Sequence, residues 1–110
     1  MQGKKIAIIA KEACEEKKGI DVTILDLRGL SPITDYFVIA SGGSERQVAA
    51  LADNVQFRLH EKHIKIDHLE GLPEARWVLL DYDSVIVHVF YKETRFYYGL
   101  ERLWGDAPRI

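Results

Sequence analysis

Apolar residues recur at helical spacing in two separate parts of the chain. The first lies in residues 4–18, where they gather on one side of a predicted amphipathic helix. Gly19 follows, and glycine is favoured just past a helix C-terminus. The second lies in residues 42–63, where Ser44 and Gln47 have the spacing of a capping box. The apolar stripe of this second helix consists of Val48, Leu51, Ala52, Val55 and Leu59.

Five further segments are rich in strand-forming residues. They are residues 20–27, 36–41, 64–71, 76–82 and 84–91. The second of these, "YFVIAS", is apolar almost throughout, which is typical of a strand buried on both faces. The third, "IKIDHLEG", alternates and ends at Gly71. Because only Asp83 separates the last two segments, we expect them to form a hairpin.

The last segment, residues 92–108, is predicted to be one helix. Its apolar stripe consists of Phe96, Leu100, Leu103 and Trp104. Gly99 lies inside this stripe and lowers helix stability by about 1 kcal/mol relative to alanine.

The predicted order of elements is α-β-β-α-β-β-β-α. A mixed five-stranded sheet with helices packed mainly on one face satisfies this order, which makes the fold class α/β, of the α+β type. With 110 residues, 47% of them hydrophobic, residues 1–110 are expected to form a single domain.

The net charge of the chain argues against nucleic acid as its main partner. It is −2, whereas proteins that bind a phosphate backbone are usually basic, so direct sequence-specific binding to nucleic acid is not expected. A local basic face can nevertheless exist within a neutral average. Cys14 is the only cysteine, and no apolar stretch is as long as a membrane span. We therefore expect a cytoplasmic protein that has no disulfide and is not bound to a membrane.

The pair Asp81 and Asp83 has the D-x-D spacing with which nucleotidyltransferases bind magnesium, and "GGS" at 42–44 precedes a predicted helix as in those enzymes. The separation of the two motifs is too long, however, and the following strand offers no third carboxylate. The alternative is that Asp83 occupies a hairpin turn, where the aspartate side chain bonds nearby backbone. The turn is the favoured interpretation.

Three histidines are candidate metal ligands or catalytic groups. His60 and His63 lie one helical turn apart but have no third metal ligand nearby in sequence. His88 alternates with Ile86 and Phe90 along a predicted strand, so we expect it on a partly buried face and hydrogen-bonded there.

Trp77 and Tyr82 lie at the two ends of the fourth predicted strand. Strand alternation places them on opposite faces of the sheet, unless the turn rotates Tyr82. Aromatic residues mixed with carboxylates suit a protein-binding hot spot and the edge of a core equally well.

Taken in order, several motifs resemble those of one known family. "SPITDYFVIASGGSERQV", "EG" at 70–71, "WVLLDY", "VIVHVF" and "RFYYGLERLWGDAP" are similar to the ribosomal silencing factors, the RsfS or Iojap family. The resemblance extends from the first predicted helix to Pro108. It implies a nucleotidyltransferase-like topology without the active site, and a protein that is not an enzyme and needs no cofactor.

The resemblance also implies a partner. Family members bind the large ribosomal subunit through its fourteenth ribosomal protein, block its association with the small subunit and so repress translation when nutrients are short. They often form homodimers. Two alternatives remain: a magnesium-dependent nucleotidyltransferase that uses Asp81 and Asp83, and a homodimeric scaffold protein.

Carried over residue by residue, the partner-binding surface of the family falls on Trp77, Asp81, Tyr82 and Asp83. The family usually has Asp-Tyr-Gly-Asp here, so this chain departs from it with Asp83 in place of glycine and Ser84 in place of the second aspartate. Asp83 is therefore expected to adopt the conformation of a glycine, which aspartate tolerates better than most residues. The two carboxylates can pair with the basic groups of a ribosomal protein, and Trp77 and Tyr82 supply apolar anchors.

Overall fold

The sheet of the computed structural model, which describes residues 2–110, contains five strands in the order β1-β2-β5-β4-β3. The strands are β1 (Ile20–Asp26), β2 (Tyr36–Gly42), β3 (His68–Glu70), β4 (Trp77–Asp81) and β5 (Val85–Tyr91). β2 and β5 pair in parallel at the centre, and every other neighbouring pair is antiparallel. The predicted mixed five-stranded sheet is thus confirmed.

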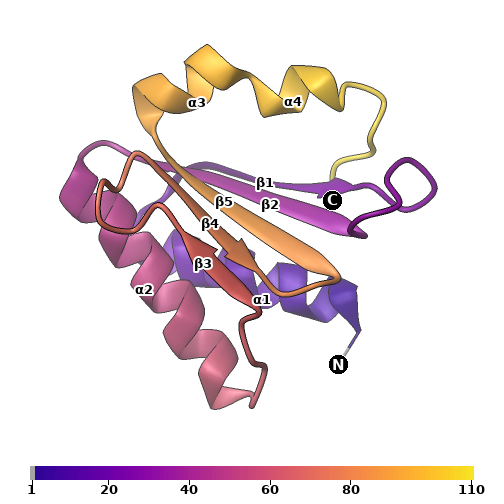
Figure 1. Ribbon diagram of the computed structural model, residues 1–110, viewed down its shortest axis with the longest axis horizontal. Helices are drawn as coiled ribbons and strands as arrows, with labels where there is room; N and C mark the ends of the chain where they lie inside the picture. Colours follow the sequence, from indigo (N-terminus) through magenta and orange to yellow (C-terminus); the bar gives the residue numbers. More distant parts are fainter. Residues whose placement is uncertain (1) are drawn as a thin grey trace.

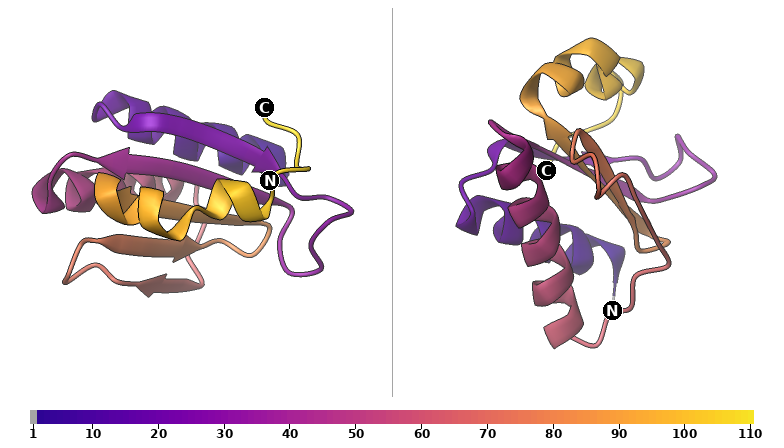
Figure 2. Two further views of the ribbon diagram at one scale, coloured as in Figure 1. Left: turned by 90° about the horizontal axis from the view of Figure 1, so that it is seen from above. Right: turned by 60° about the vertical axis from the view of Figure 1, so that its left-hand side comes forward.

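Helices cover both faces of the sheet, but unequally (Figures 1 and 2). The helices are α1 (Gly3–Glu16), α2 (Glu45–Glu61), α3 (Lys92–Tyr98) and α4 (Leu100–Leu103). The two long helices, α1 and α2, pack side by side on one face, which we call the α1–α2 face. The short α3 and α4 cross the other face, the α3–α4 face. No helix within residues 2–110 is long and apolar enough to cross a membrane.

The core follows from this two-sided cover. Strand alternation sends Val78, Leu80 and Tyr82 toward the larger cluster, which α1 and α2 complete. A smaller cluster on the α3–α4 face holds Leu25, Leu27, Ile39, Phe90 and Ala107. β2, buried along almost its whole length, contributes to both clusters, as its uninterrupted apolar sequence predicted.

Polar side chains mark the start of α2 and connect it to the end of α1. The Ser44 hydroxyl accepts the Gln47 amide at 3.1 Å, as a capping box requires. The Gln47 side chain accepts the Gly43 amide at 2.7 Å and donates to the Lys18 carbonyl at 2.9 Å, so it joins the start of α2 to the end of α1. At that end the left-handed residue is Lys18, with φ of 62°, and not Gly19.

The third strand is much shorter than the sequence predicts. Only His68–Glu70 of the expected 64–71 pairs with β4. Ile64 and Ile66 instead pack from a loop against the larger core cluster, so the alternation of the segment reflects burial without strand pairing.

The predicted C-terminal helix is broken at Gly99. This residue has φ of 59° and ends α3, and a new short helix begins directly after it. Leu100 and Trp104 pack on the smaller core cluster, but Phe96 is 81% exposed and Leu103 is 73% exposed. The prediction of one continuous apolar stripe is therefore wrong, because the left-handed residue redirects the chain midway.

The C-terminal residues close part of the outer edge of β1. The Asp26 amide donates to the Pro108 carbonyl at 2.8 Å, and the Ile110 amide donates to the Ile24 carbonyl at 3.1 Å. Leu25 and Arg109 form an isolated antiparallel bridge between these bonds. The tail thus satisfies edge groups that would otherwise be available to another chain.

Candidate docking surface

β4 and β5 form the predicted hairpin, and the two aspartates have different roles in its turn. Asp83 is the left-handed residue, with φ of 70°, which confirms the conformation expected for the position where the family has glycine. The side chain that bonds the backbone belongs to Asp81, whose Oδ1 accepts the Asp83 amide at 2.8 Å. The Tyr82 amide then donates to the Val85 carbonyl at 2.8 Å and closes the turn.

Strand alternation separates the two aromatic residues predicted for partner binding. Trp77, Leu79 and Asp81 lie on the α3–α4 face of β4, whereas Tyr82 joins the larger core cluster on the α1–α2 face. Tyr82 is only 6% exposed, and burial raises the pKa of its hydroxyl to about 12. The structure therefore brings Trp77 and Asp81 onto one face and leaves Tyr82 on the other, with little surface to offer a partner there.

Trp77 is held in place by the aromatic residues around it. Its Nε1 donates to Nδ1 of His88 on the neighbouring strand at 3.1 Å. Its ring centroid lies 5.0 Å from that of Phe90 and 4.7 Å from that of Tyr98. The indole of Trp77 is thus half-buried and fixed in orientation.

His88 is buried, 4% exposed, and hydrogen-bonded as predicted. Because Nδ1 accepts the Trp77 proton, the imidazole is neutral with its own proton on Nε2. Burial lowers the pKa of His88 to about 4, and within residues 2–110 its buried Nε2 has no hydrogen-bond partner. Sequence reasoning missed this pairing, although the period of two on adjacent strands could have indicated it.

A half-covered apolar strip extends from Trp77 along the α3–α4 face of the hairpin. Leu79 and Ile86 are both half-buried, and alternation and pairing put them on this face with Asp81. Neither Asp81 nor Asp83 has a cationic side chain within ion-pair distance among residues 2–110. We call the surface formed by Trp77, Leu79, Asp81, Asp83 and Ile86 the hairpin strip.

The magnesium hypothesis required a third carboxylate beside Asp81 and Asp83. Over the described part of the chain, no three histidine, cysteine or acidic residues are grouped so that they could hold a metal ion. The residues present do not fit a two-metal site, because Asp81 is already bonded to the turn and Asp83 points from an exposed, left-handed position.

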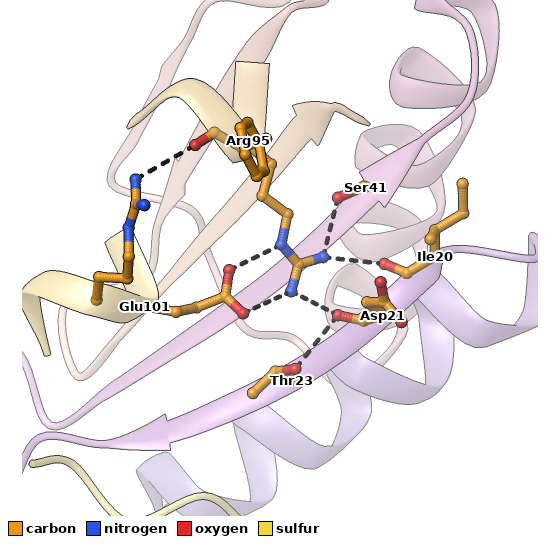
Figure 3. Close-up of polar contacts among 8 residues, drawn as sticks. Ile20, Asp21, Thr23, Ser41, Arg95 and Glu101 are labelled. Carbon is orange, nitrogen blue, oxygen red and sulfur yellow. Dashed lines mark hydrogen bonds and ion pairs between the residues drawn. The ribbon is translucent and has the colours of Figure 1, made fainter. Parts of the chain in front are cut away.

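A buried cation, which sequence reasoning missed, holds the C-terminal segment (residues 92–110) against the sheet. Arg95 of α3 is 9% exposed and donates all five of its N–H groups (Figure 3). Its acceptors are the Glu101 carboxylate at 2.9 and 3.1 Å, the Ser41 hydroxyl at 2.9 Å, and the carbonyls of Ile20 at 3.1 Å and Asp21 at 2.7 Å. The sequence contains no clear signal of this role, because Arg95 stands between the polar Thr94 and the aromatic Phe96.

The two carbonyls reach Arg95 because β1 is irregular at its start. The pairing of β1 with β2 shifts between Ile20 and Thr23, and Asp21 has φ of 48°. The Arg95 guanidinium also holds the pKa of the Glu101 carboxyl below its usual range, and Arg109 contributes to this shift.

Comparison with known proteins identifies the family of this chain. The model of the family described as "Ribosomal silencing factor during starvation" matches residues 2–110. The chain is 47% identical over 108 residues to the ribosomal silencing factor RsfS of Bacillus subtilis (strain 168), covering 98% of this chain and 92% of that protein. It is 30% identical to the chloroplastic protein Iojap of Zea mays, covering 94% of this chain and 45% of the plant protein.

A solved structure shows the same architecture. The crystal structure of a protein from Chromobacterium violaceum superimposes with a TM-score of 0.93 at 41% sequence identity, covering 96% of this chain and 88% of that one. Together with the family model, which spans the whole described chain, this degree of likeness settles the relationship. The chain belongs to the RsfS family of ribosomal silencing factors.

Proposed function

We propose that this protein is a cytoplasmic ribosomal silencing factor that acts without catalysis. It binds the large ribosomal subunit through its fourteenth ribosomal protein, occupies the surface where the small subunit joins, and thereby represses translation. Family membership over residues 2–110 supports the silencing role. The hairpin strip supports a protein partner, because it combines a fixed, half-buried indole with apolar neighbours and carboxylates that lack a cationic partner within the described chain.

The observation that carries the docking site is the orientation of Trp77. An indole whose N–H is already bonded to His88 presents a rigid apolar surface, so it loses little conformational freedom when a partner covers it. Asp81 and Asp83 lie at the far end of the same hairpin and can pair with the arginine and lysine side chains that are frequent in ribosomal proteins. These two features suit a basic protein better than bare RNA.

Co-sedimentation with isolated large subunits, combined with light scattering of subunit joining, tests the proposal. The wild-type protein is expected to travel with large subunits and to slow their joining to small subunits. Trp77→Ala is expected to weaken binding by more than tenfold, as truncation of an interface hot spot does. Phe57→Ala removes an aromatic side chain that is 60% exposed on α2 and is the matched control. A wild-type protein that neither sediments nor slows joining contradicts the proposal.

Asp81→Asn separates charge from shape. The amide oxygen can still accept the Asp83 amide, so the turn is kept while the charge is lost. Binding is expected to weaken several-fold and to become less sensitive to salt. Asp53→Asn, at an exposed position of α2, is the control and is expected to change nothing.

Tyr82 distinguishes a docking role from a core role. Because it is buried on the α1–α2 face, Tyr82→Phe is expected to keep both stability and subunit binding. If Tyr82→Phe abolishes binding while unfolding remains cooperative, Tyr82 contacts the partner directly and the docking surface includes the end of the hairpin on both faces.

Self-association is a separate proposal that rests on the family resemblance. Light scattering at micromolar concentration measures it directly, and a monomer at these concentrations contradicts it. The result also decides whether a homodimeric scaffold remains an alternative to silencing, since that alternative requires a stable dimer.

A further inference from the structure

A groove lined mainly by cations lies between α3, the first turn of α4 and the start of β1. Its charged lining consists of Lys92, Arg95, Arg102 and Arg109 together with Asp21 and Glu101. Four positive and two negative side chains give the groove a net charge of +2, opposite in sign to the −2 of the whole chain. We call this surface the basic groove.

The cations of the basic groove fall into two kinds. Arg95 has no donor left for a ligand, because all its N–H groups are bonded within the chain and the Glu101 carboxylate neutralises its charge. Lys92, Arg102 and Arg109 are exposed, and none has a carboxylate within ion-pair distance among residues 2–110. Three cations are therefore free to bind an anion at the surface.

Gly99 determines how one of these cations lies. A Cβ at Gly99 would clash with Nη2 of Arg102, so the guanidinium folds back closely over this residue. The same Nη2 donates to the Phe96 carbonyl at 3.5 Å. The absence of a side chain at Gly99 thus lets Arg102 reach across the break between α3 and α4 to the backbone carbonyl of Phe96.

The basic groove also contains an aromatic ring that the fold does not use. Phe96 is 81% exposed and lies in the groove with the exposed Ile20 and the half-buried Val22. An exposed aromatic ring in the same groove as several cations is the combination with which proteins bind single-stranded nucleic acid, because bases stack on the ring and phosphates pair with the cations. The aspartate and glutamate side chains of an acidic peptide would pair with the cations, but they carry no aromatic ring to stack on Phe96.

We propose that the basic groove binds single-stranded RNA, with phosphates at Lys92, Arg102 and Arg109 and a base stacked on Phe96. The choice of RNA rests on the proposed function, which places the protein on the ribosome; the charge and the stacking surface are independent of it. Binding by this chemistry is tolerant of sequence, since every base can stack and every nucleotide carries a phosphate. The basic groove is thus a second contact site, separate from the hairpin strip.

Fluorescence anisotropy with a short labelled oligoadenylate tests the proposal on the isolated protein. Because three phosphates are contacted, the logarithm of the association constant is expected to fall with the logarithm of salt concentration with a slope of about −2. Phe96→Ala is expected to weaken binding on the order of tenfold through lost stacking, and Arg102→Gln to reduce the salt slope by about one third. Both side chains are exposed, so the fold is expected to persist, and cooperative unfolding checks this.

Matched variants elsewhere on the surface make the result specific. Phe57→Ala removes an exposed aromatic residue of α2 and Lys62→Gln removes an exposed cation, and both are expected to bind RNA as the wild type does. Equal affinity of Phe96→Ala and wild type overturns the proposal, as does displacement of the RNA by polyglutamate at equal charge concentration. A protein that sediments with large subunits but does not bind the oligonucleotide overturns this proposal alone, whereas RNA binding without subunit binding overturns only the proposed function.

Discussion

The β4–β5 hairpin and the C-terminal segment, residues 92–110, present aromatic side chains in opposite ways. In the hairpin, Trp77 is hydrogen-bonded to His88 and surrounded by rings, and Tyr82 is buried in the core. In the C-terminal segment, Phe96 is largely exposed, and the fold depends on the cation next to it, Arg95. The aromatic residues of the hairpin are therefore positioned by strand pairing. In the C-terminal segment, the hydrogen bonds of Arg95 hold α3 in place and leave Phe96 exposed to solvent.

This difference is also one of charge. The hairpin strip ends in two carboxylates, and the basic groove holds three exposed cations, although both surfaces belong to a chain whose net charge is only −2. An average near zero thus conceals two local fields of opposite sign, each suited to a different kind of partner.

Removing the hydrogen bonds of Arg95 is expected to have the largest effect on stability. Arg95→Met leaves the Glu101 carboxylate, the Ser41 hydroxyl and two backbone carbonyls without their donor. The free energy of unfolding is expected to fall by about 3 kcal/mol, because breaking a buried ion pair from one side leaves an uncompensated charge. Denaturant titration measures the change.

Arg102→Met is the matched control for Arg95→Met. Arg102 is exposed, and its contact with the Phe96 carbonyl is long, so its removal is expected to change stability by less than about 0.5 kcal/mol. Equal stability of the two variants would show that the C-terminal segment is held by its apolar contacts and not by Arg95.

A change of pH acts on the hairpin instead. The pKa of His88 is about 4 in the folded protein and about 6.5 for an unperturbed histidine, so between these values the unfolded chain binds more protons. The contribution of His88 to the free energy of unfolding is therefore fully present above a pH of about 6.5 and is lost as the pH falls toward 4. The expected loss is about 2 kcal/mol between pH 8 and pH 5. Denaturant titrations across this range measure it.

His88→Asn isolates the contribution of this residue. The asparagine side chain offers an oxygen to the Trp77 indole but does not titrate. We expect the variant to lose most of the pH dependence between pH 8 and pH 5, because the titrating imidazole has been removed. An unchanged slope would mean that the proton is taken up elsewhere and that His88 is accessible to water.

The turn of the hairpin is expected to give the smallest effect. Asp83 has φ of 70°, which glycine adopts without strain, so Asp83→Gly is expected to raise the free energy of unfolding by about 0.5 kcal/mol. Asp83→Ala is expected to lower it by a similar amount, because alanine has the Cβ without the local polarity that helps aspartate. Opposite signs in denaturant titration support the conformational explanation, and equal signs contradict it.

Much of the fold was predictable because local pattern and tertiary environment agree. The alternation of β4 predicted which side chains face each helix pair, and the Ser44 cap predicted where α2 begins. The length of β3 was not predictable, since Ile64 and Ile66 alternate without pairing. The break in the last helix was predictable only in part. Gly99 was identified as a position that weakens the helix, but the ion pair that joins Arg95 and Glu101 across it forms only in the folded chain.

The candidate sites were predictable to a lesser degree. Trp77 and Asp81 fall on one surface, but Tyr82 faces the core, which alternation already implied. The cations of the basic groove come from α3, α4 and the C-terminal tail and meet only in the folded chain. No spacing in the sequence brings Lys92, Arg102 and Arg109 together, because Arg109 reaches the groove through its bridge to β1.

The parallel pairing at the centre of the sheet has a consequence for the order of folding. Tyr36 pairs with Val85, which follows it by 49 residues, and this register continues to Gly42 and Tyr91. Closing so long a loop is entropically costly and slow compared with hairpin or helix formation. During synthesis, the first half of the chain can therefore form only the β1–β2 pair until β5 has left the exit tunnel, and we expect the other edge of β2 to remain exposed to chaperones until then.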